Sequence, residues 1–80
     1  MRLSELKKGV QAVVHRVEDA VADDPIAQRL RDFGFVAGEA VRVVALGPLG
    51  ADPLLVQVGY TRFALRRAEA SRVLLVDGTS

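Results

Sequence analysis

The chain has 80 residues, half of them hydrophobic, so we expect one globular domain over residues 1–80 with a small core. Eleven basic and ten acidic residues give a net charge of +1, and aromatic residues are few, which argues against a nucleic-acid surface. The chain has no cysteine, so disulfides, thiolate catalysis and cysteine metal sites are excluded.

The N-terminal third of the chain predicts a helical turn, a strand and an acidic loop. Leu3 and Leu6 share a face of one helical turn, from which they would close one end of a core. Residues 10–17 are rich in valine, as strands are, and strict alternation would place Val14 and Val17 on opposite faces of that strand. An acidic loop then leads into a helix.

Residues 24–34 predict a short helix with clear signals at both ends. Asp24 can cap the N-terminus with its carboxylate, and Pro25 at the first helical position loses no hydrogen bond. Gly34 stands where many helices end in a residue with positive φ. The apolar side chains of one face are Ile26, Leu30 and Phe33. We expect this face to be buried, at roughly 1.5–3 kcal/mol for each side chain.

The remaining chain predicts four more strands joined by turns. These strands are residues 41–45, 54–58, 61–65 and 73–76. Residues 47–53 carry the turn formers of a long hairpin loop, and Gly59-Tyr60 fits a two-residue type II′ turn. A helical turn over 66–70 precedes the last strand, and residues 77–80 should fray. The fold class predicted is mainly β, a small SH3-like five-stranded β-barrel with one inserted α-helix and short helical turns.

Four segments, in this order, match a known pattern over nearly the whole chain. They are Leu3-x-x-Leu6-x-x-Gly9, residues 28–38, residues 50–54 and residues 63–70. With them the chain resembles the FeoA family, the small cytosolic component of bacterial ferrous iron uptake, although Ala51 interrupts the family's Gly-Asp-Pro hairpin. The same barrel occurs as a C-terminal domain of iron-dependent repressors, and the lack of a DNA-binding domain here favours the stand-alone protein.

The resemblance implies a role rather than a reaction. The implied function is a non-enzymatic accessory or regulatory protein of ferrous iron uptake, and the implied partner is the cytosolic part of a FeoB-type GTPase permease. We therefore expect a cytoplasmic protein, with recruitment to the inner membrane through that partner as a further option. A monomer or a weak homodimer is expected, without nucleic acid.

The residues themselves give no case for catalysis or for membrane insertion. With one His and no Cys, no nucleophilic triad can be argued, and residues 47–50 lack the Lys and Ser/Thr of a phosphate-binding loop. We expect no enzyme activity, including GTP hydrolysis. No apolar run approaches the ~20 residues of a membrane span, and no signal-peptide segment opens the chain.

The only candidate metal site joins the single histidine to the acidic loop. Its candidate ligands are His15, Glu18, Asp19 and Asp23, with Asp24 beside them. Oxygen and nitrogen donors suit Fe²⁺, Zn²⁺ or Mn²⁺, but a tight site needs three or four convergent ligands. The alternative is a solvated loop that favours the helix N-terminus. We expect no required cofactor and at most a weak surface Fe²⁺ or Zn²⁺ ion; metal sensing or delivery is the alternative function.

The hairpin loop and its flanks form the candidate partner surface. Its residues are Leu46, Pro48, Leu49, Pro53, Leu55 and Tyr60. SH3-type proteins grip extended partners with apolar and aromatic loop residues, but a single Tyr argues against polyproline recognition. Alternatively, Leu49 folds back onto its own hairpin.

Five arginines could form a basic patch for an acidic partner. They are Arg29, Arg31, Arg62, Arg66 and Arg67. The alternatives are a solvated face, or ion pairs of Arg29 and Arg66 with Asp32 and Glu69, which would stabilise by only ~0–1 kcal/mol when exposed.

Overall fold

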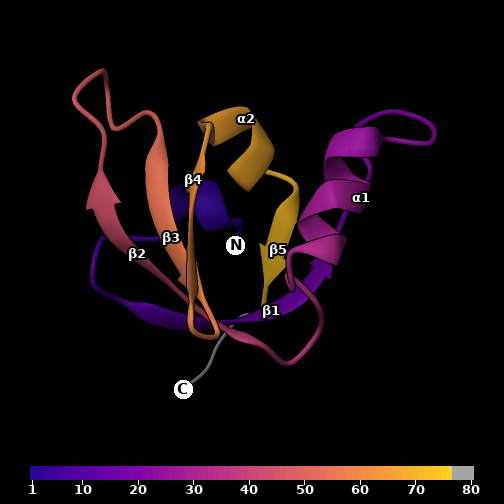
Figure 1. Cartoon of the computed structure of the whole chain (residues 1–80), viewed down its shortest axis with the longest axis horizontal. Helices are drawn as coiled ribbons and strands as arrows, with labels where there is room; N and C mark the ends of the chain where they lie inside the picture. The colour runs from indigo at the N-terminus through magenta and orange to yellow at the C-terminus, as the bar shows by residue number, and fades with distance from the viewer. Residues whose placement is uncertain (77–80) are drawn as a thin grey trace.

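The computed structural model describes residues 1–76, which form one five-stranded antiparallel sheet with three short helical segments (Figure 1). The elements in chain order are η1 (Leu3–Glu5), β1 (Gln11–Val17), α1 (Pro25–Asp32), β2 (Ala40–Leu46), β3 (Leu54–Val58), β4 (Thr61–Leu65), α2 (Arg67–Ala70) and β5 (Val73–Leu75). The predicted mainly β fold with one inserted helix is therefore confirmed. The predicted fraying of residues 77–80 lies outside the described residues.

The sheet curls into a barrel that is not closed. The strand order is β4-β3-β2-β1-β5, so β4 and β5 are its two ends and do not pair with each other. Helix α1 bridges this opening, because Phe33 at its C-terminus stacks on Phe63 of β4 and Asp24 at its N-terminus pairs with Arg72 just before β5. In the described part of the chain, no helix is long and apolar enough to cross a membrane.

Helix α1 begins and ends as its local signals predict. Asp24 is the N-cap, Pro25 is the first helical residue, and Gly34 follows the last turn with a φ of 110°. The chain then turns back, so that the Phe35 backbone N–H donates to the carbonyl oxygen of Leu30 at 3.1 Å and the Phe35 side chain is fully buried. The aromatic side chain buried in the core at the end of the helix is therefore that of Phe35.

The predicted apolar face of α1 is only partly buried. Leu30 is 2% exposed, but Ile26 is half-buried and Phe33 remains 41% exposed, while the small Ala27 is fully buried. The prediction for Phe33 was wrong because this residue is the C-cap, where the helix ends beside β4 rather than over the core. Its ring lies flat on that of Phe63, with 4.5 Å between ring centroids.

A bulge in β1 changes which of its valines face the core. The pairing of β1 with β5 shifts register between Val14 and Arg16, so Val14 and Val17 are both buried, although strict alternation placed them on opposite faces. Strand β2 has a similar shift between Val43 and Ala45, which leaves Ala45 only half-buried. The strict alternation predicted for β1 is therefore wrong, and in both strands an extra residue reverses the faces.

One core unites every helix and strand. It contains the predicted pair Leu3 and Leu6 of the N-terminal turn together with residues of all five strands and both α-helices. The first residues also complete the sheet, since the Leu75 backbone N–H donates to the Met1 carbonyl oxygen at 2.8 Å and Arg2 bridges to Leu74. The outer edge of β5 is therefore covered.

Candidate functional site

The β2–β3 hairpin loop, residues 47–53, is closed tightly at its base. The Gly47 backbone N–H donates to the Pro53 carbonyl oxygen at 2.7 Å. The Asp52 carboxylate accepts from the backbone N–H of Arg67, the first residue of α2, at 3.1 Å. The loop is thus anchored both across its own base and to a second element.

The Arg67 side chain holds the hairpin to the body of the protein. Its Nη1 donates to the Ala51 carbonyl oxygen at 3.2 Å, and its Nη2 donates to the Ser4 carbonyl oxygen at 2.8 Å. The basic patch predicted from the sequence includes Arg67, because these long-range carbonyl contacts have no local signature. One side chain therefore connects the hairpin, α2 and η1.

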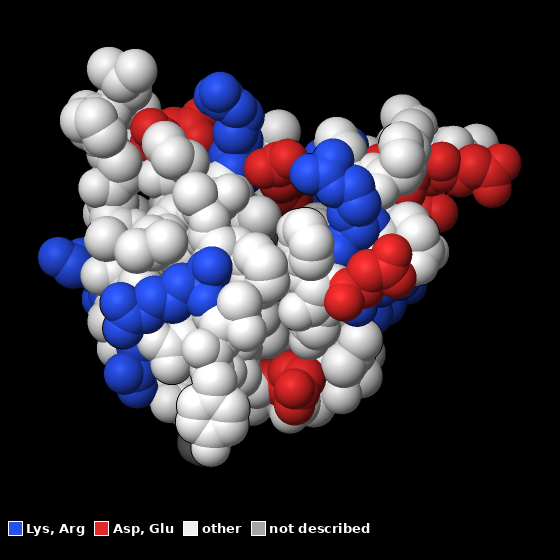
Figure 2. All heavy atoms as spheres, viewed as in Figure 1, with Lys and Arg blue, Asp and Glu red and all other residues white. Residues whose placement is uncertain are grey.

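The hairpin tip presents apolar side chains to solvent. Leu49 is 80% exposed and Leu46 is 47% exposed, Pro48 and Pro53 are exposed, and Leu55 is half-buried. The loop projects away from the barrel, and Figure 2 shows an uncharged surface at the same corner. Leu49 does not fold back onto its own hairpin, so the folded-back alternative is wrong.

Tyr60 lies apart from the other residues of the predicted partner surface. It occupies the β3–β4 turn and is fully exposed. The hairpin loop joins the opposite end of β3, and a five-residue strand spans roughly 17 Å. Tyr60 therefore does not share one patch with Leu49. We use the term hairpin surface for the remaining five residues, Leu46, Pro48, Leu49, Pro53 and Leu55.

Gly47→Ala is expected to destabilise the protein by about 1–3 kcal/mol, because the added methyl group has no space. A Cβ at this position would lie 2.6 Å from the Asp52 carbonyl oxygen and 2.7 Å from the Pro53 backbone nitrogen. Urea unfolding measures the change. Ala51→Gly is the control: Ala51 has a φ of 62°, which glycine adopts readily, so its stability should change by less than about 1 kcal/mol. Parent-like stability of Gly47→Ala would contradict the tight loop base.

The structure does not bring the predicted metal ligands together. Within residues 1–76 there is no group of three or more His, Asp or Glu side chains that could hold a metal ion. Glu18 instead pairs with Arg2 at 3.0 Å, and Asp19 pairs with Arg31 at 2.8 Å. His15 is exposed, beside a shallow depression that it lines with Arg31 and Val36 among others. Glu18 and Asp19 thus pair with arginines and do not converge with His15 on one metal site.

Asp24 is the buried charged residue of this region. Its Oδ1 accepts from the backbone N–H groups of Ile26 and Ala27 at 3.0 and 3.4 Å, and its Oδ2 accepts from the Ala20 backbone N–H at 2.9 Å and from Arg72 Nε at 2.7 Å. The Arg72 guanidinium, with these backbone groups, holds the pKa of the Asp24 carboxyl well below its usual range. Both carboxylate oxygens of Asp24 are therefore occupied by contacts within the fold and are not available to bind a metal ion.

The five arginines of the predicted basic patch divide into two groups. Arg31, Arg62 and Arg67 donate to protein acceptors, whereas the guanidinium groups of Arg29 and Arg66 make no ion pair within the described residues. The predicted pairs of Arg29 with Asp32 and of Arg66 with Glu69 are absent there. Asp32 accepts from Gln28 Nε2 at 3.1 Å, and Glu69 accepts from the Arg66 backbone N–H at 2.8 Å, which caps α2.

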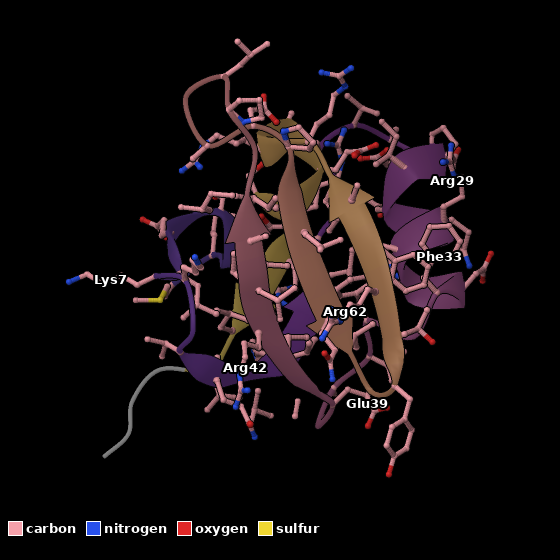
Figure 3. The ribbon with its side chains drawn as sticks, turned by 60° about the vertical axis from the view of Figure 1, so that its left-hand side comes forward. Lys7, Arg29, Phe33, Glu39, Arg42 and Arg62 are labelled. Carbon is pink, nitrogen blue, oxygen red and sulfur yellow. The ribbon has the colours of Figure 1, made fainter. Side chains whose placement is uncertain are left out.

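A cleft between α1 and β4 was not foreseen from the sequence. It encloses about 260 Å³ and is lined by Arg29, Leu30 and Phe33 of α1, by Phe63 and Ala64 of β4, and by Glu69 of α2. Figure 3 shows α1, with Arg29 and Phe33, beside β4. The helical spacing predicted that this face of α1 would be fully buried. In the structure, part of the face lines an open cleft, and this depends on where β4 lies. We call it the α1–β4 cleft.

Known proteins resemble this chain in sequence and in structure. The "Fe(2+) transport protein A/Fe(2+) transporter FeoB fusion protein" of Porphyromonas gingivalis is 38% identical over 73 residues, which make up 91% of this chain but 8% of that protein. The zinc complex of FeoA from Stenotrophomonas maltophilia, described as an SH3 domain protein, is 60% identical, with a TM-score of 0.89 over 95% of this chain and 89% of that one. This likeness confirms the SH3-like fold.

A manganese-dependent transcriptional repressor also resembles this structure, with a TM-score of 0.78 over 95% of this chain and 40% of that one. At 21% identity this likeness concerns the fold alone. The FeoA domain model, by contrast, matches the sequence itself over residues 1–77. Because that match covers almost the whole sequence, the chain belongs to the FeoA domain family.

Proposed function

We propose that this protein is a non-enzymatic accessory or regulatory protein of ferrous iron uptake that binds the cytosolic part of a FeoB-type permease through the hairpin surface. The fusion relative, whose name joins an Fe²⁺ transport protein A to an FeoB transporter, supports a role beside such a permease. The protein would act in the cytoplasm as a monomer or weak homodimer and reach the inner membrane through its partner. We expect no GTP hydrolysis by the protein alone.

The exposure of Leu49 on an anchored loop carries this proposal. A leucine that is 80% exposed is unfavourably solvated, and its burial in a partner would contribute roughly 1.5–3 kcal/mol. The hydrogen bonds of Asp52 and Arg67 fix the loop before binding, so little conformational entropy is lost when a partner docks. A pre-formed apolar tip of this kind suits the centre of a small protein interface.

Leu49→Glu is expected to weaken binding to the cytosolic GTPase domain of the cognate permease by at least about tenfold, because a charge would have to be buried. Calorimetric titration, with and without Fe²⁺ and guanine nucleotide, measures the affinity. The thermal stability should change little, since the Leu49 side chain is 80% exposed. Tyr60→Glu, a change of a fully exposed residue at the other end of β3, is the control and should bind like the parent. Unchanged affinity of Leu49→Glu would contradict the proposed contact.

Metal sensing or delivery is the second candidate function, and the zinc complex of the Stenotrophomonas maltophilia protein favours it. In the present protein His15 is exposed and accessible to a metal ion, and Asp23 lies in the nearby loop. A zinc titration of the parent and of His15→Ala distinguishes the two functions. Micromolar zinc binding that is lost in His15→Ala supports the metal-handling function, and its absence supports the adaptor function.

A further inference from the structure

Four polar side chains form a continuous row across the outer face of the sheet. Each lies directly opposite the next on the neighbouring strand, and opposed residues point to the same face. This face is the outer one, because the residues before and after Arg42 and Gln57 along their strands are buried in the core. We call the four residues the polar row: Gln11 of β1, Arg42 of β2, Gln57 of β3 and Arg62 of β4.

The amide oxygens of the polar row are already used within the row. Arg42 Nη2 donates to Gln11 Oε1 at 3.0 Å, and Arg62 Nε donates to Gln57 Oε1 at 3.1 Å. The Gln57 amide nitrogen donates to the Gly59 carbonyl oxygen at 3.3 Å. Among the described residues, the side-chain groups of the row left for a partner are therefore N–H donors, on Gln11 and on both arginines. A row that offers only donors is complementary to a group that only accepts, and an ionised carboxylate is such a group.

No acidic side chain belongs to the strands that carry the polar row. The strands β1 to β4 contain no Asp or Glu, and neither Arg42 nor Arg62 forms an ion pair within residues 1–76. Glu39 precedes β2, and by alternation it belongs to the face of the buried Val41 rather than to that of Arg42. Figure 2 shows basic and no acidic side chains over the lower left of the molecule, where Figure 1 places the lower halves of β2, β3 and β4. The charge at the row therefore attracts anions.

The spacing of the two arginines sets the spacing of the groups that they can bind. A depression of about 150 Å³ lies beside Arg42, with Gln11 and Gln57 also in its lining, and it has room for the end of one acidic side chain rather than for a small-molecule ligand. Arg62 lies two strands away, at roughly 10 Å, so a second carboxylate is needed to reach it. A segment in polyproline II conformation places residues i and i+3 on one side, roughly 9 Å apart.

We propose that the polar row binds an extended acidic segment of a partner protein, whose two carboxylates three residues apart face Arg42 and Arg62. One carboxylate enters the depression and accepts from Arg42 and from the Gln11 amide nitrogen. The other accepts from the guanidinium nitrogens of Arg62. Gln57 lies beside the β3–β4 turn, whereas the hairpin loop joins the other end of β3. The polar row is therefore separate from the hairpin surface, and the two interactions can succeed or fail independently.

The test titrates the full chain at low ionic strength with a capped Glu-Pro-Pro-Glu peptide, in which the prolines favour the extended conformation. Amide NMR spectra should show shifts at Arg42, Gln57 and Arg62. A Lys-Pro-Pro-Lys peptide should cause none of these shifts, because it offers donors and positive charge to a row of donors. A Pro-Glu-Glu-Pro peptide has the same charge with the wrong spacing, and it should bind at least about threefold more weakly.

Gln57→Glu separates the charge of the polar row from its shape. The variant replaces an amide by a carboxylate of similar size, keeps both arginines and keeps an acceptor for Arg62, so its melting temperature should stay near that of the parent. It should bind Glu-Pro-Pro-Glu at least about tenfold more weakly, because the row then neutralises its own charge. Gln28→Glu makes the same change on α1 and is the matched control, with affinity like the parent's. Leu49→Glu, which tests the hairpin surface, should also bind this peptide like the parent.

Four outcomes would overturn the proposal. They are full affinity of folded Gln57→Glu, equal binding of the lysine peptide, equal binding of the Pro-Glu-Glu-Pro peptide, and no shift at millimolar Glu-Pro-Pro-Glu. Tighter binding of a single-stranded thymidine oligonucleotide of the same charge would overturn it as well, because the row would then be a phosphate-binding surface.

Discussion

Leu30→Asp is expected to unfold the protein. Leu30 is 2% exposed and belongs to the hydrophobic core between α1 and the barrel. Removing a buried leucine costs roughly 2–5 kcal/mol, and burying an unpaired charge adds to this cost. A chain of this length has only about 4–12 kcal/mol of total stability, so the sum of both effects is comparable with the whole.

Circular dichroism during thermal unfolding measures this effect. The parent should show one cooperative transition, and Leu30→Asp should show little or none. Gln28→Asp places the same side chain on the exposed face of the same helix and is the matched control, with a change of less than about 1 kcal/mol. If Leu30→Asp melted at the parent's temperature, the assignment of α1 to the core would have to be abandoned.

Asp24→Asn is expected to lower the melting temperature at neutral pH by at least roughly 5 °C. Asparagine is also a good N-cap, so the helix start is kept while the charge that faces Arg72 is lost. The Arg72 side chain is only 13% exposed and would keep the Ala68 carbonyl oxygen as its acceptor but lose its carboxylate. Glu18→Gln, in the more exposed pair with Arg2, should lower it by less than about 3 °C.

The same carboxylate predicts how stability depends on pH. In an unfolded chain the pKa of aspartate is about 3.9, whereas in the folded protein the pKa of Asp24 is well below its usual range, chiefly because of Arg72. As the pH falls, the unfolded state therefore binds a proton first. The stabilisation by Asp24 is complete above about pH 5 and is lost progressively below about pH 4. Melting temperatures measured across this range should fall more steeply for the parent than for Asp24→Asn; parallel curves would contradict the assignment.

Local signals explain why the helix and the turns could be predicted from the sequence. The bounds of α1 depend on Asp24, Pro25 and Gly34, which act within a few residues of themselves. The hairpin tip was also predictable, because turn formers and apolar residues alternate within one short loop. These features need no knowledge of distant parts of the chain.

Long-range packing explains what the sequence did not reveal. The bulge in β1 arises from its pairing with β5, almost sixty residues away, and so cannot be seen in the strand's own alternation. The candidate metal ligands are close together in sequence. In the fold, however, Glu18 pairs with Arg2 and Asp24 pairs with Arg72, and the sequence gives no sign of these partners. The α1–β4 cleft likewise exists only because a helix and a strand thirty residues apart meet.

Helix α1 protects the protein from aggregation as well as stabilising it. Strands at the edge of a sheet readily pair with other chains, and proteins resist this by covering or charging such edges. Here α1 and the ring of Phe33 stand beside the free edge of β4, and Arg62 adds a charge to that strand. Local unfolding of α1 would expose the edge together with Phe63 and Leu65. Cover of this strand edge therefore depends on a helix of only eight residues.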